Sequence, residues 1–556
     1  MLCPAAMKTH LLALAALLAS TAASADTLVS NVNGIQADAN GNLERFTGIL
    51  IGSDGKVKRL LHGEMLKLRD TDVVDARGQT VMPGMIDAHG HFMGLGYSAL
   101  QLDLTGTSSL GELQDRLRKY AAANPQARWI VGRGWNQEMW PVKNFPSAAD
   151  LDAVVSDRPV VLTRVDGHAL VANSAAMKEA GVTASTPSPA GGRIENGLFV
   201  DNAMNLIEPE IPAATAAEAD AALEKAQEIM LGFGLTAMAD MGTDPSGWEA
   251  MNRAGETGRL RVRIMSYAGA LPTLKAIGRT APTNWMYADR LRMGGVKLYA
   301  DGALGSRGAW LKQPYADHPE TRGLQFLSNA EMRDQAGKAA AMGFQVATHA
   351  IGDAANAQVI STYEGLSKQY GTDRRWRIEH AQIVDPADIP RIAKAGIIAS
   401  MQPTHQTSDR LMAEKRLDPP RLEGAYAWQT ILKSGAKMAF GSDFPVESPN
   451  PFPGLSAAIS RQDMNGQPPG GWRPEERVSL AQAIEGFSTW AAYAGFAEDR
   501  IGGLAPGKWA DFIIVDRDPT KVDAQSLGRT QVLETWVAGK KAWEKPANGA
   551  PGERGR

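Results

Sequence analysis

The chain has 556 residues, and 58 Lys and Arg against 61 Asp and Glu give it a formal charge of −3. This near-neutral balance argues against a protein built to neutralise nucleic-acid phosphates. Charged residues at 21% and hydrophobic residues at 44% are ordinary globular values, which exclude a disordered chain. The length exceeds that of an ordinary domain and therefore indicates more than one structural unit.

The first residues have the pattern of a secretory signal peptide. Lys8 supplies a positive charge, residues 11–19 are apolar, and A-S-A at 23–25 is a small-residue cleavage signal. So short an apolar run cannot span about 30 Å of hydrocarbon, so no membrane anchor is expected. We therefore expect residues 1–25 to be removed and the mature protein to be periplasmic or extracellular. Cys3 is the only cysteine, so the mature protein has neither disulfides nor thiolate metal ligands.

Both ends of the remaining chain have β character. Residues 26–80 alternate apolar and polar positions around Gly and Asp turns, and residues 498–545 contain two similar segments, at 511–519 and 532–544. Two β segments that flank a long middle region predict one small β domain assembled from both ends. The tail, 546–556, is rich in Gly and Pro and is expected to be flexible.

The middle region, 81–497, alternates short apolar runs with helix-like stretches, which indicates an α/β fold with a parallel sheet or barrel. The candidate strands are 81–91, 235–242, 261–269, 293–302, 344–353, 376–384, 397–405 and 437–446. Eight strand–helix repeats fit a (β/α)₈ TIM barrel. The gap at about 100–230 is too long for one crossover. It predicts a large insertion after the first strand, on the face where barrel active sites form.

Histidine is scarce, and its placement is informative. His89 and His91 are two residues apart on a strand, so both imidazoles point the same way and can meet one cation. The other candidates at or near strand ends are His349, His380, His405, Lys297 and Asp443. Each alone has an ordinary alternative, such as a surface histidine, a turn-forming aspartate or a salt-bridge lysine. Because the strands of a barrel end at one mouth, their coincidence predicts a metal site.

Several segments resemble the amidohydrolase superfamily, in particular its YtcJ-like (amidohydrolase 3) branch. They are MPGMIDAHGH, GVKLYADGALGSRGA, ATHAIGD, RIEHAQ, FGSDFPVESPNPF and GLAPGKWADFIIVDRDP, and they occur in family order. The resemblance extends over about residues 26 to 540. It implies a metal-bearing (β/α)₈ barrel beside a β-sandwich-like domain made from both termini.

The resemblance also implies a ligand set for one or two divalent ions. A first ion would be bound by His89, His91 and Asp443, and a second by His349 and His380. Lys297 matches a lysine that many members carry as a CO₂-derived carbamate between two metals, although members with one metal leave this bridging role open. Zinc suits imidazole and carboxylate ligands best, with manganese and iron as alternatives.

Catalytic roles follow from that site. A metal lowers the pKa of water to about 7, and Asp443 is expected to accept the proton as general base. His405 is expected to hold the developing oxyanion, or else to support a ligand. His168, within the insertion, is expected to reach the substrate from a lid, or else to make a structural hydrogen bond.

Weaker features remain open. Asp301 and Arg307 either shape the pocket or bind a substrate carboxylate, or they form a loop-stabilising ion pair. Trp135 and Trp140 either line a pocket or pack inside the insertion. Glycines at 302, 305 and 308 match neither a P-loop nor a dinucleotide fingerprint, so no phosphate site is expected.

The leading hypothesis is an exported metal-dependent hydrolase that cleaves a carbon–nitrogen bond other than a peptide bond, in a small amide, N-acyl or cyclic amide substrate. One alternative is an esterase or lactonase that uses the same site. Another is a non-catalytic binding or regulatory protein, which would be expected to lack Asp443 or a histidine. Apolar stretches in the insertion favour a homodimer.

Overall fold

A computed structural model gives the structure of the chain. The residues it describes are 25–38, 40–64, 71–189 and 191–546. The predicted signal peptide, apart from its last residue, and the predicted tail after residue 546 lie outside the described residues. Within the described part of the chain, no helix is both long and apolar enough to cross a membrane.

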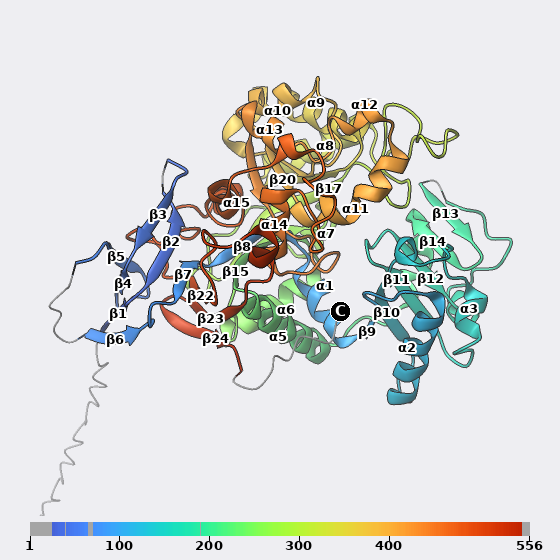
Figure 1. Ribbon diagram of the computed structural model, residues 1–556. Helices are drawn as coiled ribbons and strands as arrows, with labels where there is room; N and C mark the ends of the chain where they lie inside the picture. The colour runs from blue at the N-terminus through green and yellow to red at the C-terminus, as the bar shows by residue number, and fades with distance from the viewer. Residues whose placement is uncertain (1–24, 39, 65–70, 190, 547–556) are drawn as a thin grey trace, which may run out of the picture.

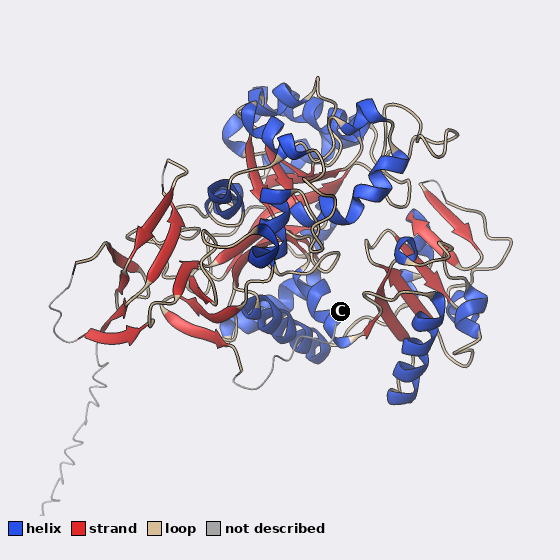
Figure 2. Ribbon diagram, in the orientation of Figure 1, coloured by secondary structure: helices blue, strands red, loops and turns tan. Residues whose placement is uncertain are grey.

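The centre of the molecule is an eight-stranded parallel sheet that curls into a nearly closed barrel (Figures 1 and 2). In order, its strands are β8 (Met85–Gly90), β15 (Leu235–Thr243), β16 (Arg263–Ala268), β17 (Leu291–Tyr299), β18 (Gln345–Ala350), β19 (Arg377–His380), β20 (Ile398–Met401) and β21 (Lys437–Phe440). A single parallel bridge between Gly90 and Phe444 links the first strand to the segment after the last. The predicted (β/α)₈ barrel is confirmed.

Helices surround this sheet, and most of them bury an apolar face against the core. They are α1 (Phe92–Leu100), α5 (Ala216–Gly232), α6 (Pro245–Glu256), α7 (Leu271–Ala276), α8 (Asn329–Ala341), α9 (Asp353–Tyr370), α10 (Ile389–Lys394), α11 (Pro403–Arg416), α12 (Pro419–Leu422), α13 (Trp428–Lys433), α14 (Pro451–Ser460), α15 (Leu480–Gly486) and α16 (Thr489–Ala494). Helix α8 is typical: a capping box between Ser328 and Glu331 starts it, and it buries Met332, Ala336 and Ala340 at helical spacing.

Small and apolar side chains fill the end of the barrel where the strands begin. Ile86, Ala237 and Ile398 belong to this buried group, and Ala491 and Ala492 of α16 pack against it. This end is therefore closed, and the polar residues gather at the opposite end, where the strands finish.

The expectation of one strand over 81–91 is wrong, because two strands of different sheets share that stretch. β7 (Thr80–Pro83) lies between β2 and β22 in a terminal sheet, and β8 starts the barrel two residues later. Gly84 stands between them, and a Cβ there would lie 2.4 Å from Thr236 Oγ1. Only glycine allows this close approach, which occurs at the point where the chain passes from the terminal sheet into the barrel.

Two further sheets lie side by side beyond the closed end of the barrel, at the left of Figure 1. One contains β1 (Asp26–Ser30), β4 (Gly48–Ile51), β5 (Val57–Leu61) and β6 (Thr71–Asp75). The other contains β2 (Asn33–Ala37), β3 (Leu43–Phe46), β7, β22 (Phe512–Val515), β23 (Val532–Val537) and β24 (Lys540–Glu544), and α17 (Ala524–Gly528) precedes β23. Strands from both ends of the chain thus share one sheet, and one buried apolar group joins the two sheets as a sandwich-like unit.

The long connection after α1 forms a unit of its own, at the right of Figure 1. Its six-stranded sheet holds β9 (Leu102–Asp103), β10 (Ile130–Trp135), β11 (Val160–Arg164), β12 (Ala169–Ala172), β13 (Gly192–Glu195) and β14 (Leu198–Asp201), with α2 (Leu110–Ala123), α3 (Ala148–Asp152) and α4 (Ser174–Glu179). Trp135 and Trp140 are buried in its core, and their indole nitrogens donate to the carbonyls of Leu162 and Thr107. Of the two roles considered for these tryptophans, the structure shows packing.

Candidate metal centre

All the site residues predicted from the sequence lie in one group at the barrel mouth, here called the mouth cluster. It comprises His89, His91, His168, Lys297, His349, His380, His405 and Asp443. The strand ends supply most of these side chains, because parallel strands of a barrel finish at one face. His168 comes from the insertion, and His405 lies in the first turn of α11, not at the end of a strand as expected.

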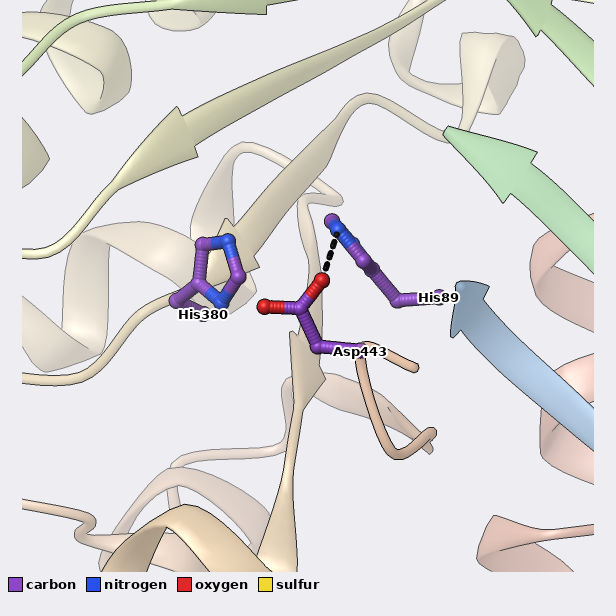
Figure 3. A group of neighbouring side chains, drawn as sticks. All are labelled: His89, His380 and Asp443. Carbon is purple, nitrogen blue, oxygen red and sulfur yellow. Dashed lines mark ion pairs between the residues drawn. The ribbon is translucent and has the colours of Figure 1, made fainter. Parts of the chain in front are cut away.

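Asp443 lies between His89 and His380 in the mouth cluster (Figure 3). Its Oδ1 atom is 3.1 Å from His91 Nε2 and 3.4 Å from His89 Nε2, and its Oδ2 atom is 3.9 Å from His405 Nε2. Its backbone is left-handed, with φ of +60°, and its amide donates to the His89 carbonyl at 2.7 Å. This conformation is uncommon for a residue with a side chain, and it directs the carboxylate toward three imidazoles.

The donor atoms suit a divalent cation. His89, His380 and Asp443 are all buried, and each offers one ligand atom within 4.8 Å of the others. Lys297 Nζ is 3.5 Å from His89 Nε2, and the His349 ring centroid is 4.6 Å from that of His380. Imidazole nitrogen and carboxylate oxygen are the ligands that zinc and related ions take in proteins without cysteine.

The protonation states also suit a cation. Burial, reinforced by the Lys297 ammonium, lowers the pKa of His89 to about 4, and burial holds the pKa values of His349 and His380 well below their usual range. Burial opposes ionisation of Asp443, yet the facing imidazoles hold the pKa of its carboxyl well below the usual range. Neutral imidazole and ionised carboxylate are the forms that bind metal.

A carboxylate that the sequence analysis did not single out orients His89. Glu379 Oε2 is 2.6 Å from His89 Nδ1, and Arg377 holds the same carboxylate at 2.7 and 3.0 Å. Because a carboxylate only accepts, Nδ1 carries the proton and Nε2 keeps a free lone pair facing the mouth cluster. The available signal was the charged pair Arg377 and Glu379, two residues apart on an apolar strand.

Two other polar residues play similar supporting parts. Gln402 Oε1 accepts from His380 Nδ1 at 2.8 Å, which leaves Nε2 of that ring for a ligand. Asp87 accepts from the backbone and hydroxyl of Ser442, and so fixes the loop that carries Asp443. A Cβ on Gly441 would lie 2.5 Å from Asp87 Oδ1, so this packing requires glycine.

The insertion contributes His168 beside His349, with 5.6 Å between ring centroids. Asp201 Oδ1 lies 2.8 Å from His168 Nδ1. Burial lowers the pKa of the His168 imidazole, but the Asp201 carboxylate raises it by more, so the pKa lies above its usual value. The Asp201 carboxylate occupies space that a Cβ at Gly302 or Gly308 would crowd, at 3.1 and 2.8 Å. The absence of a side chain at these glycines therefore leaves space for the Asp201 carboxylate of the insertion.

Asp301 and Arg307 do not pair with each other, and each has its own partners. Asp301 is buried and accepts from the amides of Trp310, Ile351 and Gly352, while burial raises the pKa of its carboxyl to about 7. Arg307 forms a partly exposed ion pair with Asp317 at 2.8 Å. Arg307 thus stabilises a loop, whereas Asp301 also lies beside the mouth cluster, with its Oδ1 atom 3.6 Å from His349 Nε2.

A (β/α)₈ barrel with buried histidine and carboxylate donors at its mouth is the arrangement of a metal-dependent barrel enzyme. The sequence matches the model of the amidohydrolase family over residues 72–542. The chain belongs to this family, and the predicted resemblance is confirmed.

Relatives agree with this assignment. The chain is 31% identical to the putative amidohydrolase YtcJ of Bacillus subtilis, over 88% of this chain and 95% of that protein. It is 26% identical to an N-substituted formamide deformylase of Arthrobacter pascens, over 86% and 90%. A crystal structure of an uncharacterized metal-dependent hydrolase from Pyrococcus horikoshii superposes with a TM-score of 0.74 at 28% identity, covering 90% of this chain and 99% of that one.

Proposed function

We propose that this protein hydrolyses a carbon–nitrogen bond other than a peptide bond, in a small amide, N-acyl or cyclic amide. The observation that carries the proposal is the buried set His89, His380 and Asp443, with the Asp443 carboxylate also facing His405. The relative that deformylates N-substituted formamides supports the choice of a carbon–nitrogen bond.

The proposed ligands are those of the mouth cluster. His89, His91 and Asp443 would hold a first ion, preferably zinc, and His349 and His380 would hold a second. Lys297 would join them as a carbamate if two ions bind. Its burial beside His89, with Nζ 3.5 Å from His89 Nε2, supports this role because it places the lysine among the proposed metal ligands.

In the proposed reaction, each of three side chains has a separate role. A divalent cation, when bound, polarises a carbonyl and makes water a nucleophile near neutral pH. Asp443 takes the proton from the attacking water at Oδ2 and returns it to the departing nitrogen. His405 Nε2, which is buried and has no hydrogen-bond partner among the described residues, donates to the oxyanion. His168, with Asp201 behind it, contacts the substrate from the side of the insertion.

A substrate panel tests the proposal. The zinc-reconstituted protein, expressed from Asp26 onward, is given N-acyl amino acids, N-formyl amines, cyclic amides and aryl esters, and amine or alcohol release is measured. We expect release of amine that depends on zinc and is lost in Asp443→Asn. Turnover of esters alone would move the protein to the esterase alternative, and binding of these compounds without any turnover would favour a non-catalytic protein.

We also propose export and self-association, on the sequence alone. The pattern of residues 1–25 supports export, and the apolar stretches of the insertion support a homodimer. Cell fractionation with mass spectrometry of the mature N-terminus tests the first, and sedimentation of the purified protein tests the second. A protein that keeps Lys8 and stays in the cytosol would contradict export.

A further inference from the structure

Strands β16 and β17 separate before they reach the barrel mouth. β17 stays paired with β18 as far as Tyr299, opposite His349. Its pairing with β16 stops at Val296, opposite Ala268. Beyond that point, one edge of β17 has no strand partner in the barrel sheet, and the wall of the barrel opens there.

A cavity of about 470 Å³ lies at this opening. Lys297, Leu298 and Tyr299 all line it, although consecutive residues of a strand point to opposite faces of the sheet. The cavity therefore meets β17 at its edge, where β16 and β17 separate. Leu271 of α7 lines it as well, as does Phe326, whose amide donates to the Ala300 carbonyl.

The cavity extends from solvent to Lys297, which is the mouth-cluster residue in its lining. Its outer rim includes the exposed ion pair of Asp334 and Lys338 on α8. At its inner end, Lys297 is 1% exposed and lies next to His89. The Tyr299 ring forms the wall between the two spaces: its centroid is 4.6 Å from Lys297 Nζ and 5.5 Å from the His349 ring centroid.

The walls between these ends are mostly apolar. Leu271, Leu298, Phe326 and Leu327 provide aliphatic and aromatic surface, and the volume falls within the range of small-molecule sites. Ala270, at the start of α7, also lines the cavity and has φ of +113°, a conformation that favours glycine. Strained backbone of this kind occurs preferentially at ligand sites.

We propose that this cavity binds an apolar alkyl or aryl substituent of the substrate while the amide itself lies at the mouth cluster. The proposal rests on the proposed hydrolysis and narrows its substrate class to amides with one apolar arm. The arm lies against Leu271 and Leu327, with Tyr299 beside the bond to be cleaved.

A tryptophan that fills the cavity tests this proposal. Leu271→Trp is compared with Val73→Trp, a matched tryptophan at a position of β6 that is 63% exposed. N-methylacetamide is compared with N-hexylacetamide and with N-methylhexanamide, so that the arm is placed on either side of the amide. Binding to the zinc-loaded protein is measured by calorimetry, separately from turnover.

We expect wild type and Val73→Trp to bind one of the two longer amides at least about tenfold more tightly than N-methylacetamide, because each buried methylene adds about 0.8 kcal/mol. Leu271→Trp should lose this preference while zinc content and Tm are kept. Leu327→Trp gives the same test if Leu271→Trp does not fold. A preference that survives both substitutions, or none in wild type, would overturn the proposal. A preference in binding without turnover would refute only the hydrolysis.

Discussion

Two layers of polar residues inside the barrel differ in how they are satisfied. Below the mouth, Arg377 donates to Glu379, to the Ala88 carbonyl at 2.7 Å and to Ser400 Oγ at 3.0 Å, and all its partners are buried. At the mouth, the Asp443 carboxylate faces imidazole nitrogens at 3.1 to 3.9 Å, and His405 Nε2 has no hydrogen-bond partner among the described residues.

This difference indicates that the lower layer holds the site in place and that the upper layer binds the ion or the substrate. A buried polar network in which every group has a hydrogen-bond partner stabilises one arrangement of its side chains. Ligand atoms that face one another without such bonds suit the binding of a cation or a substrate. The lower layer therefore fixes the geometry of the upper one, and Glu379 joins them through His89. Substitutions in the two layers should consequently have different signatures.

The largest effect is expected in the upper layer. Asp443→Asn removes both the proton acceptor and an anionic ligand, so kcat should fall by about 10³-fold or more with Tm nearly unchanged. Steady-state amine release measures it, and Asp499→Asn, at an aspartate that is 71% exposed, is the matched control. Full activity in Asp443→Asn would show that the carboxylate is not the base.

Lys297→Ala should change metal stoichiometry. If the lysine bridges two ions as a carbamate, the variant should hold one ion where wild type holds two, and excess bicarbonate should not restore the second. Elemental analysis measures this, with Lys275→Ala in the exposed part of α7 as control. Equal stoichiometry in wild type and variant would make Lys297 a structural residue.

Glu379→Gln should affect both layers. Loss of the charged acceptor weakens the hydrogen bond that orients the His89 imidazole, so zinc affinity should fall by about 10–100-fold. Because Arg377 is left buried without its counter-charge, the free energy of unfolding should fall by about 3–5 kcal/mol. Competition with a chelator and urea unfolding measure the two. Glu498→Gln, at a pair whose carboxylate is 39% exposed, should cost less than about 1 kcal/mol.

The smallest effect is expected where the insertion meets the barrel. Gly308→Ala crowds the Asp201 carboxylate, from which its Cβ would be 2.8 Å, and so displaces His168. Overcrowding of this kind costs about 1–3 kcal/mol, and we expect KM to rise several-fold with zinc content unchanged. Gly365→Ala, which would meet no atom within 4 Å, is the control. An unchanged KM would place His168 outside substrate binding.

The sequence predicted the barrel well because each strand is a short apolar run followed by a helix. It also located the mouth residues, since chemistry concentrates at strand ends. Periodicity could not show that 81–91 changes sheets at Gly84, because both strands are equally apolar. Nor could it place His405 in the first turn of α11, because the strand ends at Met401 and a proline two residues later starts the helix.

The supporting residues were harder to find. Glu379, Asp87 and Gln402 matter through partners far away in the chain, such as His89, which is 290 residues from Glu379. Local pattern carries no information on such pairs. The charges of Arg377 and Glu379 on a buried strand were visible, but an isolated ion pair gives the same pattern.

The central claim is that the mouth cluster binds a catalytic divalent cation. Anomalous diffraction at the zinc edge, from crystals of the zinc-loaded protein, tests it most directly. The account predicts a peak bounded by His89, His91 and Asp443, with a second peak beside His349 and His380 if Lys297 bridges two ions. Zinc bound only elsewhere, or no peak at this position in fully loaded protein, would contradict it.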